Sequence, residues 1–155
     1  MSTINRILAA TNFDAPSQHA LDSALTMAER LGATITLLHV LDLPLYAYYA
    51  DRLPADYAVN LELVALSILA DLLGQVRERV PSANGLLCHG LPWSQIVEHA
   101  ETMACDIVVL GSHARSGKGH GLLGSVGRDV SRRSKVPVLT VQNPQSAVRS
   151  LPLYS

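Results

Sequence analysis

A glycine-rich stretch, GSHARSGKGHGLLGS (residues 111–125), is the segment of this sequence whose residue types could do chemistry. Five of its fifteen residues are glycine, and Lys118 lies near its centre. It follows the apolar run DIVVL, which is typical of a buried strand. Glycine-rich turns between a strand and a helix let backbone amides approach phosphate oxygens closely. The stretch is therefore a candidate phosphate site.

Two common phosphate motifs fit this stretch incompletely. A P-loop needs G-x-x-x-x-G-K-S/T, but Ser112 stands at its first glycine position and Gly119 at its hydroxyl position. The pattern G-x-G-x-x-G occurs at residues 119–124, but it does not directly follow the strand. The acidic residue expected about 20 positions later is also missing, since Pro144 stands there. We reject both motifs.

A helix that begins at Gly124-Ser125 offers a third arrangement. The backbone amides of Ser125, Val126 and Gly127 would then be unpaired donors at the positive end of the helix dipole. The Ser125 hydroxyl would add a hydrogen bond, and the Lys118 ammonium group would add a positive charge. This arrangement predicts an anion site between the strand end at Gly111 and the start of the helix.

The elements that must position this site alternate between strand and helix periodicity along the chain. Asp14 is the candidate N-cap of the first helix, and Gly32 ends that helix. A connection, residues 41–56, contains the helix breakers Pro44 and Pro54. The predicted strands are 6–11, 34–40, 85–90, 106–111 and 136–141, and the predicted helices are 17–31, 57–76, 92–103 and 125–134. The inward face of the second helix is predicted to be Tyr57, Leu61, Val64, Ala65, Ile68, Leu69, Leu72 and Val76.

The alternation indicates an α/β fold: a three-layer α/β/α sandwich around a five-stranded parallel sheet. Right-handed crossovers leave the strand orders 3-2-1-4-5 and 2-1-3-4-5. Ligands of such sheets bind beyond the carboxyl ends of the strands, where the order reverses. For the order 3-2-1-4-5, residues 11–14 and the glycine-rich stretch would line that crevice.

Composition limits the class of protein. With 155 residues, 48% of them hydrophobic, the chain is long enough for one domain with a substantial core. A net charge of −1 gives no general attraction to nucleic acid or to an anionic membrane. No run approaches the length of a membrane span, and the start has no apolar signal region. The two cysteines indicate free thiols in a reducing compartment, so we expect a cytoplasmic protein.

The stretch also resembles a known signature, G-x2-G-x9-G-S/T, of the universal stress protein family. The resemblance extends over ILAATNF, LLHVLD, HGLPWSQIVEHA, DIVVLGSH and LLGSVGRDVSRRSKVPVLTV. It implies the strand order 3-2-1-4-5, a family domain over residues 1–142 and a C-terminal tail over residues 143–155. It also implies an adenine nucleotide as ligand, ATP in many members, and a homodimer formed through the last strand, Val136 to Val141.

Carried over position by position, the resemblance implies a nucleotide site at the carboxyl ends of the strands. Gly111, Gly124 and Ser125 match the phosphate-binding positions, and Val40 matches the residue that packs on adenine. Ala10 and Thr11 match positions near the adenosine. The full implied site is Ala10, Thr11, Asn12, Val40, Leu110, Gly111, Ser112, His113, Ala114, Gly124, Ser125 and Val126.

Two positions depart from the family pattern. Ala114 replaces the second glycine of the signature, and an alanine at positive φ would cost roughly 1–2 kcal/mol. Asn12 replaces a frequent aspartate; its amide can bond a ribose hydroxyl but cannot help to bind Mg²⁺ as a carboxylate does. Asp14 either substitutes for that aspartate or caps the helix.

The expected function is regulatory binding of ATP, or of AMP or ADP, in a stress response, without catalysis. The alternatives are a dimeric interaction module of the same fold that binds no nucleotide, and a slow ATPase. The histidines lack zinc-site spacing, so we expect no metal site. The tyrosines of the connection, Tyr46, Tyr48, Tyr49 and Tyr57, could serve as a lid, a partner surface or a packing cluster.

Overall fold

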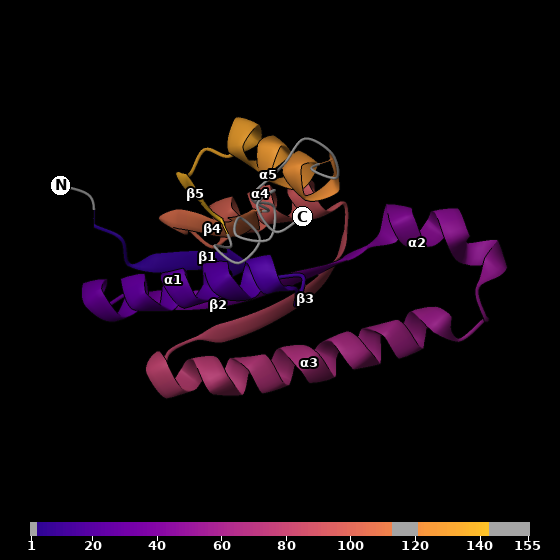
Figure 1. The fold of residues 1–155 in the computed structure, drawn as a ribbon, viewed down its shortest axis with the longest axis horizontal. Coiled ribbons are helices and arrows are strands. Elements are labelled where there is room, and N and C mark those ends of the chain that lie inside the picture. The colour runs from indigo at the N-terminus through magenta and orange to yellow at the C-terminus, as the bar shows by residue number, and fades with distance from the viewer. Residues whose placement is uncertain (1–2, 113–120, 143–155) are drawn as a thin grey trace, which may run out of the picture.

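The fold, seen in a computed structural model, contains the predicted five-stranded parallel sheet in the order β3-β2-β1-β4-β5 (Figure 1). The structure describes residues 3–112 and 121–142. The prediction of an α/β sandwich and the family-derived strand order are both confirmed. The strands are β1 (Arg6–Ala10), β2 (Thr34–Asp42), β3 (Asn84–Gly90), β4 (Ile107–Ser112) and β5 (Val138–Gln142). The predicted tail, residues 143–155, lies outside the described residues.

Helices cover both faces of the sheet because the central strands are apolar on both faces. Along β1, Ile7 and Ala9 belong to the core under α1 and α3, whereas Leu8 belongs to the core under α4 and α5. This alternation follows from the period of two of a strand. The covering helices are α1 (Ala15–Leu31), α3 (Tyr57–Arg79), α4 (Pro92–Thr102) and α5 (Gly121–Arg133).

Helix α1 begins and ends where its capping residues stand. The Asp14 carboxylate accepts a hydrogen bond from the Ser17 amide at 3.0 Å, which confirms Asp14 as the N-cap. Gly32 follows the helix with a φ of 68°, the left-handed conformation that favours glycine. Because Pro16 is tolerated in the first turn, the helix begins at Ala15, two residues before the prediction.

The connection after β2 is not the irregular segment that the two prolines suggested. It contains α2 (Leu43–Tyr49) and the 3₁₀ turn η1 (Ala50–Arg52). Asp42 caps α2 by accepting a hydrogen bond from the Leu45 amide at 3.0 Å. Pro44 lies in the first turn, where its missing N–H costs no helical hydrogen bond.

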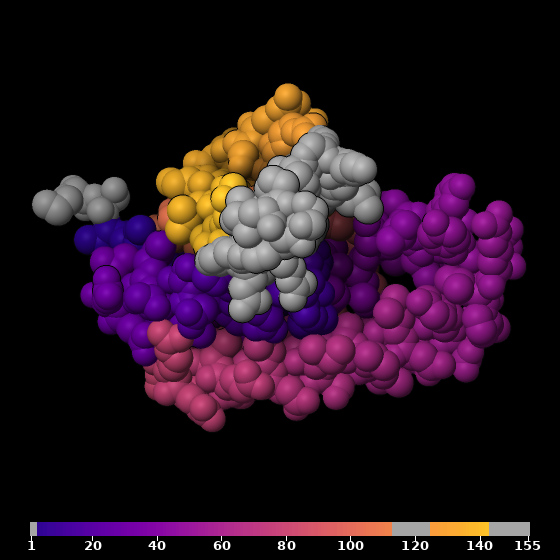
Figure 2. Space-filling model, in the orientation of Figure 1, coloured from indigo at the N-terminus to yellow at the C-terminus, as the bar shows by residue number. Residues whose placement is uncertain are grey.

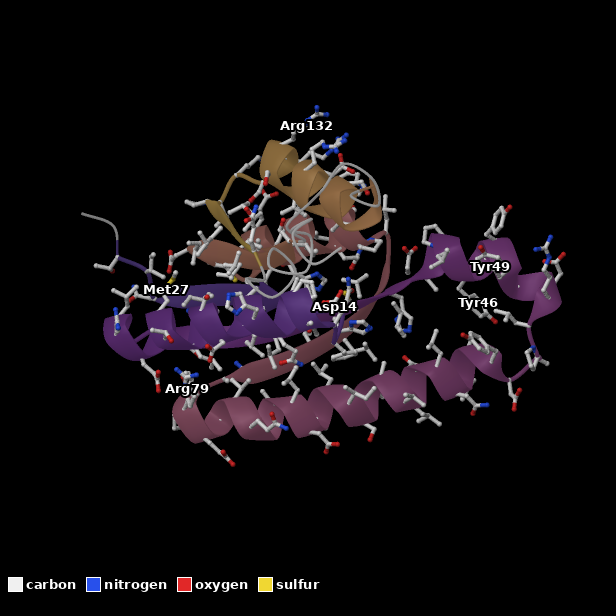
Figure 3. All side chains as sticks on the ribbon, viewed as in Figure 1. Asp14, Met27, Tyr46, Tyr49, Arg79 and Arg132 are labelled. Carbon is white, nitrogen blue, oxygen red and sulfur yellow. The ribbon has the colours of Figure 1, made fainter. Side chains whose placement is uncertain are left out.

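Helix α3 is anchored to the body of the protein from Ala65 onward. Ala65, Leu69, Leu72 and Val76 are buried, and Arg79 pairs with Asp22 and Glu29 of α1 (Figure 3). The first half, together with α2 and η1, projects beyond the sheet (Figure 1). The prediction of a continuous inward face is therefore wrong for Tyr57, Leu61, Val64 and Ile68, which are 37–55% exposed.

The prediction that no run approaches membrane-spanning length is wrong for α3. By length and composition, α3 is apolar enough to cross a bilayer. Only 22% of this apolar span is buried, and Leu69, Leu72 and Val76 of its second half belong to the core on the sheet. One such helix is weak evidence for a membrane span.

Helix α5 begins at Gly121, four residues earlier than the predicted start at Ser125. A helix that begins there uses the amides from Ser125 onward in its own i to i−4 hydrogen bonds. The prediction that Ser125, Val126 and Gly127 offer unpaired donors is therefore wrong. The N-terminal end of the helix lies one turn earlier, at Gly121.

Gly111 marks the closest approach between the sheet and α1. A Cβ at this position would lie 2.7 Å from the Ser17 nitrogen and closer still to the Pro16 carbonyl group. The first turn of α1 therefore rests directly on the carboxyl end of β4. Only a residue without a side chain permits this contact between two backbones.

We predict that Gly111→Ala destabilises the fold by about 3 kcal/mol, because backbone atoms cannot move aside as a flexible side chain can. Urea denaturation followed by circular dichroism measures this change. The matched control is Gly74→Ala in α3, where an added Cβ meets nothing within 4 Å. The control should gain about 0.5–1 kcal/mol. Equal stability of the two variants would contradict the proposed contact.

Candidate functional site

A pocket of about 550 Å³ opens at the carboxyl ends of β1 and β4, where the strand order reverses. This is the crevice predicted for a sheet of order 3-2-1-4-5. Segments from β1, α1, β2, α4, β4 and α5 contribute to its wall. The lining comprises Ala10, Thr11, Asn12, Asp14, Pro16, Ser17, Leu38, Val40, Asp42, Leu45, Leu91, Pro92, Trp93, Ile96, Leu110, Gly111, Ser125, Val126, Gly127 and Asp129.

Thr11 is a fixed polar group at the end of β1. It is only 4% exposed, and its N–H donates to the Leu38 carbonyl at 2.9 Å. Its hydroxyl oxygen accepts from the Phe13 amide at 2.9 Å. The Thr11 carbonyl lies 2.7 Å from His39 Nδ1, so this ring nitrogen carries a proton.

The neutral His39 side chain donates a hydrogen bond to the Thr11 carbonyl. Burial lowers its pKa, and the hydrogen bond to the Thr11 carbonyl opposes that effect. Its ring packs on Phe13, with the two ring centroids 4.3 Å apart. Phe13 itself has a φ of 65°, a left-handed conformation uncommon for a bulky residue. His39 therefore fixes the loop after β1.

A hydrogen-bond network holds the loop against α1. The Asn12 N–H donates to the Ser17 hydroxyl oxygen at 3.1 Å. The Ser17 hydroxyl in turn donates to the Asp14 carboxylate, which also caps the helix. Of the two roles considered for Asp14, capping is therefore the one that the geometry shows.

The inner wall of the pocket is apolar. Leu38, Ile96 and Leu110 are at most 5% exposed and belong to the core under α4 and α5. Val40 and Trp93 are partly buried beside them. The guanidinium carbon of Arg133 lies 4.4 Å from the centroid of the Trp93 ring, which orients this indole at the pocket edge. Trp93 is the only tryptophan of the chain.

The charged groups of the described lining are all acidic. They are Asp14, Asp42 and Asp129, and the first two accept helix-capping hydrogen bonds from backbone amides. No lysine or arginine belongs to the lining that the structure describes. Within residues 3–112 and 121–142, no three His, Cys, Asp or Glu side chains group as metal ligands would.

Eight of the twelve predicted site residues meet in this pocket. Ser112 ends β4 but does not line the pocket, and Gly124 lies in α5. His113 and Ala114 are outside the described residues. The eight are Ala10, Thr11, Asn12, Val40, Leu110, Gly111, Ser125 and Val126.

The sequence did not lead us to predict the part of the pocket wall that is formed by the segments following β2 and β3. Asp42 and Leu45 begin α2, and Leu91, Pro92 and Trp93 begin α4. Their positions in the sequence could have identified these residues, because both segments directly follow the carboxyl end of a strand. The prediction placed the reversal between strands one and four and did not include the loops of the neighbouring strands.

The sequence matches the universal stress protein family over residues 3–142. A curated relative, universal stress protein YxiE of Bacillus subtilis, is 28% identical over 146 residues, which cover 89% of this chain and 99% of YxiE. The solved structure of hypothetical protein MJ0577, a universal stress protein of Methanocaldococcus jannaschii, superposes with a TM-score of 0.72 at 23% identity. That likeness covers 92% of this chain and 98% of MJ0577.

A further solved structure is a universal stress protein family protein from Arabidopsis thaliana with AMP bound. Its TM-score is 0.65 at 17% identity, and the likeness covers 96% of this chain and 98% of the plant protein. At such identity it supports the fold alone. The family match, by contrast, spans nearly all residues that the structure describes, and the strand order agrees with it. This chain belongs to the universal stress protein family.

Proposed function

We propose that this chain binds an adenine nucleotide, ATP or alternatively AMP or ADP, in the pocket between β1 and β4. The role is regulatory, in a cytoplasmic stress response, rather than enzymatic. The observation that carries the proposal is the position of the pocket at the reversal of strand order. The AMP-bound plant protein of the same fold supports the ligand class.

The described lining suits the adenosine part of such a ligand. A volume of about 550 Å³ falls within the range of small-molecule sites, about 300–1,000 Å³. Val40, Ile96 and Leu110 offer an apolar wall for a base. Asn12 and Asp42, at the ends of β1 and β2, offer amide and carboxylate groups to ribose hydroxyls.

The phosphates need a different environment, because three carboxylates repel a polyphosphate. Within the sequence, the glycine-rich stretch supplies Lys118 and the helix end before Gly121 supplies backbone amides. We therefore expect the phosphates to bind toward residues 113–121. Asn12 provides no carboxylate for Mg²⁺, so we expect the nucleotide to bind without a strong requirement for the metal.

We predict that the purified protein retains an adenine nucleotide, which denaturation releases for identification by chromatography. After removal of that nucleotide, added ATP should change the emission of Trp93, because this indole lines the pocket. Val40→Phe should weaken ATP binding at least about tenfold, because the larger side chain would occupy space that the base needs. Leu31→Phe is the control, since Leu31 lies at the end of α1 and is 52% exposed.

The absence of a retained nucleotide, together with no heat of binding at millimolar ATP, would contradict the proposal. That result would favour the alternative of a dimeric interaction module without a nucleotide. If the protein releases phosphate from ATP, and Val40→Phe abolishes both this release and nucleotide binding, the result would favour the alternative of a slow ATPase.

Ala114→Gly provides a second test, directed at the position where the signature is broken. If the nucleotide approaches this position as in the family pattern, removing the methyl group should tighten ATP binding about tenfold, the equivalent of 1.4 kcal/mol. Adenosine binding should stay unchanged, because the base lies elsewhere. Calorimetric titration of both ligands measures the difference. Equal tightening for adenosine and ATP would contradict a phosphate contact at this position.

The proposal includes a homodimer formed through the last strand. The described strand, Val138–Gln142, begins two residues later than predicted and lies at the edge of the sheet. The Val108 amide donates to the Pro137 carbonyl at 2.9 Å, so alternate residues from Pro137 onward face β4. Val138 and Thr140 therefore direct their backbone groups toward the outer edge, where a second copy could pair with them.

We predict that Thr140→Pro weakens this dimer while leaving the fold intact. Proline removes the N–H that points outward, and it is tolerated on edge strands. Thr140→Val, which keeps the N–H and the β-branched shape, is the control. Sedimentation velocity measures the association. An unchanged dissociation constant for Thr140→Pro would contradict pairing along this edge.

A further inference from the structure

The strand β3 begins with the dipeptide Asn84-Gly85, which occurs once in the sequence. A short turn at residues 81–82 connects it to the end of α3. Figure 2 shows the end of α3 and the start of β3 on the surface at the lower left of the view, at the end of the molecule opposite to α2. Both residues of the dipeptide are exposed. A side-chain amide thus lies next to a backbone N–H at the surface, and these two groups can react with each other.

The backbone of Gly85 points to the outer edge of the sheet. In the described sheet, β3 is an edge strand whose neighbour is β2. The Leu38 carbonyl accepts from the Thr11 amide, so Leu38 directs its backbone groups toward β1, and Leu37 directs its groups toward β3. The register pairs Leu37 with Gly85. In a parallel ladder the partner of such a residue directs its own backbone groups away from it, so the Gly85 N–H lies on the free edge.

The Gly85 nitrogen and the Asn84 side chain are both free to react. Within residues 3–112 and 121–142, no group accepts a hydrogen bond from the Gly85 N–H, and no group bonds the Asn84 carboxamide. The glycine also has no Cβ that would shield its nitrogen from an approaching carbonyl carbon. The local structure therefore leaves open the approach of this nitrogen to Asn84 Cγ.

The other asparagines in the described part of the chain lack this combination. The amide that follows Asn5 donates to the Asp106 carboxylate at 2.9 Å. The amide that follows Asn12 donates to the Thr11 hydroxyl oxygen at 2.9 Å. Asn60 lies inside α3, where the next amide is held in a helical hydrogen bond. Each of these three asparagines precedes a residue with a bulky side chain, so a free and unshielded nitrogen follows an asparagine only at the start of β3 among the described residues.

We propose that Asn84 is a site of spontaneous deamidation, a modification that is independent of the proposed nucleotide site. The Gly85 nitrogen forms a bond to Asn84 Cγ and loses its proton, the bond from Cγ to Nδ2 breaks, and ammonia leaves. Water then adds to one of the two carbonyl carbons of the resulting succinimide and opens the ring. The products are aspartate and isoaspartate, in which the main chain passes through the side-chain carbons. The reaction consumes one water molecule and involves no oxidation or reduction.

The fold permits the movement that this reaction requires. The backbone between Asn84 and Gly85 must turn out of its extended conformation so that the nitrogen reaches Cγ. The register places the Asn84 carbonyl against the Leu37 amide, at the very start of the ladder between β2 and β3. Opening at the first residue of an edge strand is a local event that leaves the rest of the strand paired.

Deamidation changes the charge at the amino end of β3. One new carboxylate lowers the formal net charge of the chain from −1 to −2 at pH 7. Arg77 lies close to this position, since its Nε donates to the Ala83 carbonyl at 2.8 Å. The pocket lies at the opposite, carboxyl ends of the strands. We therefore expect the modification to alter this edge of the sheet and to leave nucleotide binding unchanged.

Peptide mapping by mass spectrometry tests the proposal. The folded protein and the same chain unfolded in guanidinium chloride are incubated in parallel, at mildly alkaline pH, in water enriched in heavy oxygen. Asn84 should convert in the folded protein at a rate within several-fold of that in the unfolded chain. It should give two chromatographically separate products, each with one heavy oxygen atom from water. Asn60 is the internal reference and should stay intact in the folded protein.

Gly85→Ala is the matched variant, because it keeps Asn84 but places a methyl group beside the attacking nitrogen. The added Cβ would lie 3.2 Å from Leu73 Cδ2, the end of a flexible side chain, so the fold should accept it, and circular dichroism verifies this. The variant should convert several-fold more slowly than the original chain. Equal rates in the two proteins would overturn the proposal. An Asn84 that stays intact in the folded protein while the unfolded chain converts would also overturn it.

Discussion

The contact between the end of β4 and the first turn of α1 determines the geometry of the whole binding edge. Gly111 brings the two backbones together at Pro16 and Ser17, and no residue with a side chain would permit this approach. The loop after β1 must then turn sharply between them. Phe13 takes a left-handed conformation there, and the network from Asn12 through Ser17 to Asp14 holds it. The pocket lies beside this contact, so its shape depends on the contact.

This constraint gives Gly111 a structural role in addition to the one implied by the family signature. A glycine in a phosphate loop is usually explained by the ligand that approaches it. Here the N-terminus of α1 approaches it from within the same chain, whether a ligand is bound or not. A substitution at Gly111 therefore changes the fold as well as the site. Val40 separates binding from folding better, because it packs against the core under α4 and α5 rather than against α1.

The molecule divides into a body that contains the core on both faces of the sheet and a projecting arm, formed by α2, η1 and the first half of α3, that contributes little to it. Leu69, Leu72 and Val76 in the second half of α3 pack on the sheet, and Arg79 forms ion pairs with α1. The first half of α3 extends beyond the sheet. The arm also borders the binding edge, since Asp42 and Leu45 line the pocket at the start of α2.

Much of the fold could be predicted from the sequence because its signals are local. Alternating periods located the strands, Asp14 and Gly32 located the limits of α1, and the family signature supplied the strand order. Val40 was implied by the family resemblance, and Ser125 by the resemblance and the predicted helix start. The position of Thr11 at the pocket followed from the rule that parallel strands end at one edge. These inferences require only the backbone geometry of single elements and the parallel order of the sheet.

The remaining features depended on which element covers which, and only the tertiary structure decided them. Tyr57, Leu61 and Val64 have the same helical periodicity as the buried Leu69 and Val76, but the sheet ends before it reaches them. Trp93 and Asp129 enter the pocket from α4 and α5 because those helices pack over its rim. Periodicity states which residues share a face of a helix. It does not state whether another element lies against that face, because burial is a property of two surfaces in contact.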